Sequence, residues 1–544
     1  MLIRGGTIRR GPELPHAGIR SMLDLIIRNG LVVDGTGSPG FHAAVLVHGD
    51  SITVHRGDSS AFEAARSIDA AGMVVAPGFI DMHSHGGLTI LGSPRQEASV
   101  HQGITTEVYG VDGISHAPFK TAQELSRYMW QDSGINGYPP LPAKWLSQAE
   151  LLDQYDGKVS LNAAYLAGNS PLRIWGVGWA NTPATPAQIE NMKSALREAM
   201  EDGAWGLSTG LDYPPGAYGD TAELAALAEV SAKLGGFYHT HTRKSLGVKG
   251  VMGPSEEAIE IGRRSGSAVH LTHYRQAQQG KGSHHQWIDL VENGRNEGLD
   301  VTFDVYPYEY SQGMVAQWFP FWMRERGPEG ILEAIKDGKV RDRLKREIDE
   351  ADFRDKWVTG FNKPHNKHYE GMQHLEIARI RGEHPVDTLC NLLIEEDLFL
   401  TAVGRGTNPH TLAAFVAHPY GMIASDAIHF GEFPSPRTFG TFAIVLSEYV
   451  REERQLTLEQ AVRKMSSFPA QRLGLPDRGI LRNGFKADIV VFNPKTVKAN
   501  TTREKPRQLA TGVEYVLVNG KVVVDRGVHS GATPGRALRR GKRD

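Results

Sequence analysis

The sequence contains a single cysteine, Cys390, among 544 residues. One thiol cannot form an intrachain disulfide, so we expect a protein of a reducing compartment, the cytoplasm. No stretch of about 18 apolar residues occurs, which argues against a membrane span. Lys and Arg number 60 against 62 Asp and Glu, a net charge of −2. This balance gives no sign of binding to nucleic acid or to an anionic membrane.

The start of the chain lacks the long apolar core of a secretory signal. We expect residues 1–21 to be disordered. Met22 directly precedes the apolar run Leu23 to Ile27, so a translation start at Met22 is a hypothesis raised by the sequence.

Short β-rich runs with turn residues occupy both ends of the chain, at 25–33, 44–47, 52–54, 488–492 and 515–524. The pair Asn519-Gly520 within the last run predicts a hairpin. Each end alone has too few strands to bury one face of a sheet. We therefore expect residues 22–76 and 478–535 to form one small β-sandwich domain, followed by a basic tail, 536–544.

Between residues 77 and 477, β-rich runs alternate with helix-like segments, which is typical of parallel strands with crossover helices. The expected strands are 79–83, 105–110, 160–166, 205–208, 237–242, 269–273, 299–305, 399–403 and 421–425. This number is close to the eight strands of a TIM-like (β/α)8 barrel, which we expect for the α/β core of the chain. The charged, aromatic-containing interval 310–375 is interpreted as an insertion, either folded over the barrel mouth or lying on the surface.

The segment Pro77-Gly78-Phe79-Ile80-Asp81-Met82-His83-Ser84-His85 predicts a metal site. It has the character of a buried strand that ends in two histidines. Residues two apart on a strand project to the same side, so His83 and His85 can reach one cation. Neutral imidazole is a good ligand for zinc and related divalent ions.

Other strand ends carry further ligand-type side chains. They are Asp112, His241, His273 and Asp426. Because the strand ends of a barrel surround its active site, we expect these residues to meet His83 and His85.

Three nearby residues are weaker candidates. His239 lies two residues deeper than His241, and His270 is expected on the opposite face from His273, so both are interpreted as packing histidines. Glu107 lies mid-strand, about 16 Å of extended chain below Asp112 at the usual rise per residue. Asp112 is therefore preferred as the ligand.

Several motifs together resemble the N-acyl-D-amino-acid deacylases (D-aminoacylases) of the amidohydrolase superfamily. Besides the His83/His85 segment they are Gln102-Gly103-Ile104-Thr105-Thr106, Gly206-Leu207-Ser208-Thr209-Gly210-Leu211, Tyr306-Pro307-Tyr308, Ser425-Asp426, Pro436-Arg437 and Ala487-Asp488-Ile489-Val490-Val491-Phe492. The similarity extends from about residue 23 to 540.

The resemblance implies a metal-dependent hydrolase of linear amide bonds with N-acyl amino acids as small-molecule substrates. It implies that His83, His85, His241 and His273 are ligands of one or two divalent ions, with zinc the expected metal. It also implies Asp426 as the catalytic base. Arg275, Tyr306 and Arg437 match groups that hold the substrate carboxylate. The family's cysteine ligand is replaced by Asp112, a harder ligand that bridges two cations more readily, so metal identity and number stay open.

Further departures surround the substrate. Where the family has a lysine after the last histidine ligand, this chain has Arg275. The family's Ala-Gly-Ser is replaced by Tyr310-Ser311-Gln312, and its acidic residue after His-x-His is replaced by Gly86. Substrate preference can therefore differ from that of typical members.

Two alternatives remain at this point. A cyclic-amide hydrolase of the hydantoinase or dihydroorotase kind usually bridges two metals with a carboxylated lysine, and no convincing strand-end lysine is found here. A non-catalytic scaffold would be expected to have lost ligands, whereas all four histidines and Asp426 are present. The residues do not specify an oligomeric state.

Overall fold

The computed structural model describes residues 22–137, 143–244, 253–278, 280 and 282–542. The expected disorder of residues 1–21 lies outside the described residues. No helix in these described ranges is both long enough and apolar enough to cross a bilayer.

Strands from the two ends of the chain share one seven-stranded sheet. In spatial order it contains β23 (Val528–His529), β22 (Lys521–Asp525), β21 (Val513–Val518), β20 (Ile489–Phe492), β7 (Val74–Pro77), β2 (Leu31–Val32) and β3 (Phe41–His42). The two ends meet where β20 pairs antiparallel with β7. The hairpin predicted at Asn519-Gly520 is confirmed, because both residues have positive φ and Val518 pairs with Lys521.

A second sheet is built from the N-terminal region alone. Its order is β5 (Ser51–His55), β4 (Ala44–His48), β1 (Leu23–Arg28) and β6 (Ala64–Asp69). The two sheets share an apolar cluster that includes Leu25 and Val45 from the first part of the chain and Ile489 and Leu517 from the last. The distant chain ends are therefore held together by common burial.

Parallel strands make up the centre of the molecule. One sheet has the order β24 (Ala537–Leu538), β10 (Asn162–Tyr165), β9 (Ile104–Tyr109) and β8 (Phe79–Asp81). The other has the order β11 (Ala167–Gly168), β12 (Gly206–Gly210), β13 (Phe237–His241), β14 (Val269–Leu271), β15 (Val301–Val305) and β19 (Gly421–Ile423). Only Leu166 separates β10 from β11, and a parallel bridge between Ser84 and Ala427 joins the ends of β8 and β19.

Helices follow these strands along the chain. They are α1 (Thr89–Gly92), α2 (Glu97–Val100), α3 (Ala122–Gln131), α4 (Ser133–Asn136), α5 (Gln148–Leu152), α6 (Asn169–Gly176), α7 (Pro186–Asp202), α8 (Thr221–Lys233), α9 (Gly253–Ser265), α10 (His285–Asn296), α16 (Pro409–Ala417), α17 (Arg437–Ile444), α18 (Leu458–Met465) and α19 (Ser467–Leu473). Local sequence sets where they begin: the Thr185 side chain accepts the amide N–H of Gln188 at the start of α7, and Asp220 accepts that of Glu223 at the start of α8.

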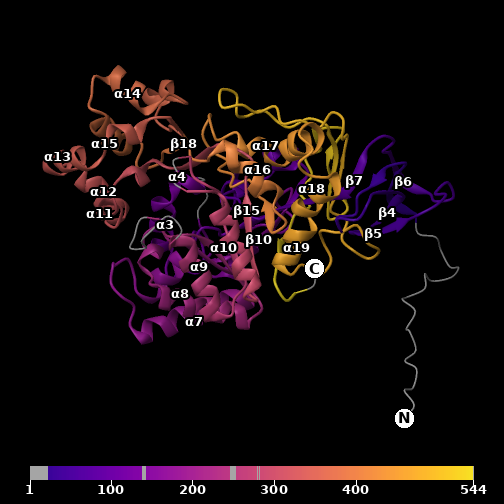
Figure 1. The fold of residues 1–544 in the computed structure, drawn as a ribbon, viewed down its shortest axis with the longest axis horizontal. Coiled ribbons are helices and arrows are strands. Elements are labelled where there is room, and N and C mark those ends of the chain that lie inside the picture. Colours follow the sequence, from indigo (N-terminus) through magenta and orange to yellow (C-terminus); the bar gives the residue numbers. More distant parts are fainter. Residues whose placement is uncertain (1–21, 138–142, 245–252, 279, 281, 543–544) are drawn as a thin grey trace, which may run out of the picture.

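The chain between β15 and α16 forms a separate body with its own apolar cluster, which includes Phe319, Leu389 and Leu400. It contains α11 (Phe321–Arg324), α12 (Gly327–Ala334), α13 (Gly338–Glu347), α14 (His374–Arg381) and α15 (Pro385–Glu395). Figure 1 shows these helices on the side of the molecule opposite β4 and β6. Cys390 is buried in α15, and burial raises the pKa of its thiol to about 12.

One predicted barrel strand belongs to this body instead. The run 399–403 does form a strand, β18 (Thr401–Arg405), but it lies between β16 (Tyr310–Met314) and β17 (Lys356–Thr359) and pairs antiparallel with both. A short apolar run has the same pattern in either kind of sheet, so the sequence could not show which partners it would take.

Candidate metal centre

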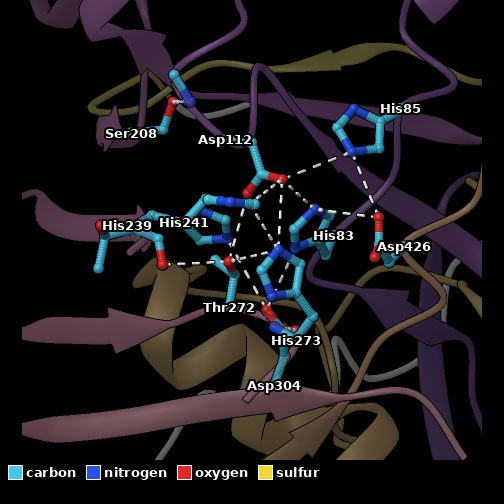
Figure 2. Close-up of polar contacts among 12 residues, drawn as sticks. His83, His85, Asp112, Ser208, His239, His241, Thr272, His273, Asp304 and Asp426 are labelled. Atoms are coloured by element: carbon cyan, nitrogen blue, oxygen red, sulfur yellow. Dashed lines mark hydrogen bonds and ion pairs between the residues drawn. The ribbon is translucent and has the colours of Figure 1, made fainter. Parts of the chain in front are cut away.

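Six strand-end side chains converge on one point at the carboxyl ends of the parallel strands (Figure 2). His83 and His85 follow β8, Asp112 follows β9, His241 ends β13, His273 follows β14 and Asp426 follows β19. These are the metal-ligand and base candidates predicted from the sequence, and the fold brings all of them together.

Asp112 is the centre of this group. Its Oδ2 lies 3.5 Å from His83 Nε2, 3.8 Å from His85 Nε2, 3.3 Å from His241 Nδ1 and 3.5 Å from His273 Nε2. Burial would raise the pKa of Asp112, but the surrounding imidazoles hold it well below its usual value. One carboxylate oxygen is therefore shared by four imidazoles.

Asp426 lies beside the first histidine pair. Its Oδ1 is 3.5 Å from His83 Nε2 and 3.3 Å from His85 Nε2, and its Oδ2 is 2.6 Å from Arg437 Nη1. Burial acts to raise the pKa of Asp426, yet the Arg437 guanidinium and His83 hold it below its usual range. The side chain is therefore a carboxylate at neutral pH and able to accept a proton.

The donor set fits a divalent cation. His83 Nε2 and His85 Nε2 are buried and have no hydrogen-bond partner among the described residues, an arrangement that is costly unless a ligand fills it. Three overlapping groups in the described residues bring one ligand atom per residue within 4.8 Å of each other: His83, Asp112 and His273; His83, His85 and Asp426; and, deeper, His83, His239 and Asp304. Imidazole and carboxylate suit zinc and related ions, and the shared His83 is compatible with one ion or two.

Two further carboxylates, which are not among the residues predicted from the sequence, support the histidines. Asp304 of β15 accepts the His273 backbone N–H at 2.6 Å, and its Oδ2 is 3.6 Å from His83 Nδ1. Asp212 Oδ2 is 3.0 Å from His241 Nε2. Asp212 follows the end of β12, so the strand-end rule applied to the other ligands could have found it. Asp304 lies one residue before a strand end, and the sequence carried no signal for it.

Of the weaker candidates, His239 forms a candidate ligand group with His83 and Asp304, and both of its ring nitrogens are buried without a hydrogen-bond partner among the described residues, so its interpretation as a packing histidine is not confirmed. Glu107 Oε2 accepts the Ser84 hydroxyl at 2.9 Å and belongs to none of the ligand groups in the described residues. His239 and His270 are fully buried and stack with ring centroids 5.2 Å apart. His270 Nε2 is 3.0 Å from Asp304 Oδ2, and His239 Nε2 is 3.9 Å from the same oxygen.

The three predicted carboxylate-binding residues form a stack. The guanidinium Cζ of Arg275 lies 4.4 Å from the centroid of the Tyr306 ring, and the Cζ of Arg437 lies 4.3 Å from the same centroid. Tyr306 Oη is buried without a hydrogen-bond partner among the described residues. Arg275 and Tyr306 line a cavity of about 270 Å³ that also contains His85, His241, His273 and Asp426 on its wall. Arg437 is fully buried behind it and contacts Asp426.

Imidazoles and carboxylates at strand ends around a polar cavity are typical of the active site of a metal-dependent hydrolase with an α/β fold. The sequence profile of the amidohydrolase family matches residues 66–524. The chain belongs to the amidohydrolase family.

Deacylases of N-acyl-D-amino acids are similar to this chain over almost its whole length. N-acyl-D-glutamate deacylase of Alcaligenes xylosoxydans xylosoxydans is 34% identical over 527 residues, which cover 96% of this chain and 98% of that protein. The crystal structure of a D-aminoacylase superposes with a TM-score of 0.80 at 30% identity, covering 95% of this chain and 100% of the other. The N-acyl-D-glutamate deacylase of Bordetella bronchiseptica, solved with zinc and a phosphonate mimic of the tetrahedral intermediate, gives 0.79 at 30% identity with the same coverage.

Proposed function

We propose that this protein hydrolyses N-acyl-D-amino acids to a carboxylate and a free D-amino acid, using a divalent metal. The observation that carries this proposal is the convergence of four imidazoles on Asp112 beside Asp426, on the wall of a polar cavity. Family membership and the nearly full-length similarity to deacylases of N-acyl-D-amino acids support it.

The metal would be held by His83, His85, Asp112, His241 and His273, as one or two ions, with zinc the expected element. When bound, a divalent cation polarises the scissile carbonyl and makes a water more acidic. Asp426 takes the proton of the attacking water and later delivers it to the departing amine nitrogen. The contact with Arg437 keeps the Asp426 carboxylate ionised and fixes its orientation.

The amino-acid half of the substrate lies toward Arg275 and Tyr306. Arg275 supplies a cation and Tyr306 an uncommitted hydroxyl, and both line the cavity. Arg437 has further guanidinium nitrogens without hydrogen-bond partners in the described part of the chain. Together the three groups offer donors that suit a carboxylate.

The proposed architecture is a (β/α)8 barrel with a small β-sandwich domain. The parallel pairings from β8 to β19, the one-residue gap between β10 and β11 and the Ser84–Ala427 bridge support barrel closure. We place the β-domain at 22–76 plus 478–535, the barrel at 77–477 and the basic tail at 536–544. Part of this tail, β24, pairs with β10 at the barrel. The insertion begins near 310, and the antiparallel partners of β18 favour an end near 405 rather than 375. The single buried Cys390 favours the cytoplasm as compartment.

The alternatives are less well supported. In a cyclic-amide hydrolase a carboxylated lysine bridges the metals, but here Asp112 lies among the four imidazoles. A scaffold that had lost its metal would not keep buried imidazole nitrogens without partners, since these are costly.

A hydrolysis screen tests the proposal. Purified protein, loaded with zinc, cobalt or manganese, is incubated with N-acetyl amino acids of both enantiomers, with dipeptides and with cyclic ureides. We expect free D-amino acid to be released and the release to stop after chelation. Opening of cyclic ureides without cleavage of any N-acetyl-D-amino acid would overturn it.

A further inference from the structure

A lysine from the insertion reaches the wall of the metal-centre cavity. Lys356 is the first residue of β17 and lines the same cavity as His273 and Asp426. In the sheet it is in register with Gly404 of β18, which on its other side is in register with Ser311 of β16. Ser311 and Gly404 line the cavity as well, so this row of the insertion sheet faces the metal centre.

Gly404 allows the lysine to lie across the sheet. A Cβ atom on Gly404 would be only 2.9 Å from both Cδ and Nζ of Lys356, so a larger residue at this position would displace the ammonium. Two residues further on, a Cβ atom on Gly406 would lie 3.8 Å from Arg275 Nη2. Gly406 lies one residue past the end of β18, so Lys356 and Arg275 approach neighbouring positions of one chain segment. With Lys244, they are the cations among the described residues that line the cavity, and Lys356 is separate from Arg275.

The Lys356 ammonium has no ion pair and no hydrogen bond within the described residues. Burial lowers the pKa of Lys356, while Asp352 and Asp355 act in the opposite direction without contacting it. The acidic groups on the cavity wall, Asp112 and Asp426, belong to the metal centre. Lys356 as a residue is half-buried, so solvent screens its charge only in part, and a bound anion would give the ammonium the partner that it lacks.

We propose that the preferred substrate is an N-acyl-D-amino acid with an acidic side chain, whose side-chain carboxylate binds Lys356 while its α-carboxylate binds at Arg275. The assignment rests on the proposed function. It places the second negative charge on the amino-acid half of the substrate, because Lys356 lies on the Arg275 side of the cavity. Lys356 thus selects the substrate and has no part in the hydrolytic step.

The test compares kcat/KM of the zinc-loaded enzyme for N-acetyl-D-glutamate, N-acetyl-D-aspartate and N-acetyl-D-glutamine. The amide is a near-isosteric neutral control for glutamate. In Lys356→Met we expect kcat/KM for at least one acidic substrate to fall about ten- to a hundredfold, as for the loss of a charged hydrogen bond. The value for N-acetyl-D-glutamine should change less than about threefold. Lys336→Met, a surface lysine of the same insertion that pairs with Glu333, is the matched control and should behave as wild type.

Charge reversal provides a second measurement. Lys356→Glu should reduce turnover of the acidic substrates further and raise that of N-acetyl-D-lysine relative to N-acetyl-D-glutamine. Equal losses for acidic and neutral substrates in Lys356→Met, or a wild-type enzyme that prefers neutral ones, would overturn the role of Lys356 while leaving the deacylase function intact. A metal-loaded wild type that cleaves none of the N-acetyl-D-amino acids would instead overturn the proposed function, and this inference with it.

Discussion

Replacing Asp304 by asparagine should weaken metal binding although Asp304 is not itself among the six strand-end candidates. Its Oδ1 accepts the backbone N–H of His273 at 2.6 Å, and its Oδ2 lies 3.0 Å from His270 Nε2 and 3.6 Å from His83 Nδ1. Burial would raise the pKa of Asp304, but the hydrogen bond from His270 and the neighbouring His83 hold it below its usual range. Asp304 is therefore a buried anion that contacts two ligand residues.

The expected loss of metal affinity in Asp304→Asn follows from the tautomer of His83. A negative oxygen near Nδ1 favours the proton on that nitrogen and leaves the lone pair of Nε2 free for a cation. An asparagine amide that faced Nδ1 would favour the opposite tautomer. Loss of such a supporting carboxylate costs about ten- to a hundredfold in metal affinity or activity, which corresponds to about 1.4 to 2.8 kcal/mol.

Competition with a chromogenic chelator measures zinc affinity, and steady-state kinetics at saturating zinc measure turnover. Thr302→Val is the matched control, because Thr302 is on the same strand and contacts His270 Nδ1 at 2.8 Å but no metal-ligand candidate. Its zinc affinity should remain within about threefold of wild type. Thermal melts establish that both variants are folded. A folded Asp304→Asn protein with wild-type zinc affinity would refute the reasoning.

Three other outcomes are expected. Asp426→Asn should lower kcat by about a hundred- to ten-thousandfold with zinc content by atomic absorption near normal, and full activity would exclude Asp426 as the base. Arg437→Lys should raise KM for carboxylate-bearing substrates, and an unchanged KM would exclude its role in the carboxylate clamp. Burial acts to raise the pKa of Asp300, but Arg472 and Arg295 hold it below its usual value, so its stabilisation is full above about pH 4 and is lost as pH falls through the folded-state pKa. At neutral pH, Asp300→Asn should therefore be less stable than wild type by about 1 kcal/mol, which lowers its Tm. The difference in Tm should shrink in acid, and a difference that stayed constant would contradict this.

Much of the site could be predicted because strand ends are visible in sequence. His83, His241 and Asp426 each close a β-rich run, and the parallel strands then bring these ends to one side of the fold. The supporting contacts could not be predicted in the same way. Asp304 lies inside a strand, and its role depends on which neighbours β14 and β8 place beside it.

The sequence also could not show which sheet each strand would join. The run 399–403 was predicted as a barrel strand, but as β18 it joins the insertion sheet and positions Gly404 under Lys356. Periodicity defines a strand and its faces, whereas pairing is decided by long-range packing. The cationic wall of the cavity is therefore a property of the fold that no local pattern shows.

Backbone conformation links the stability of the fold to its chemistry. Three of the converging residues, Asp112 (φ 54°), His273 (φ 36°) and Asp426 (φ 49°), have left-handed backbone angles that side-chain-bearing residues rarely adopt. Each costs of the order of 1 to 3 kcal/mol and persists only where surrounding contacts enforce it. Such contacts are present: the Asp426 N–H donates to the His83 carbonyl at 2.8 Å, and the His273 N–H donates to Asp304. Because a regular strand would send successive side chains to opposite faces, these turns are what aim the strand-end groups at a common point. The fold thus uses part of its stability to hold the ligand groups together before any metal binds.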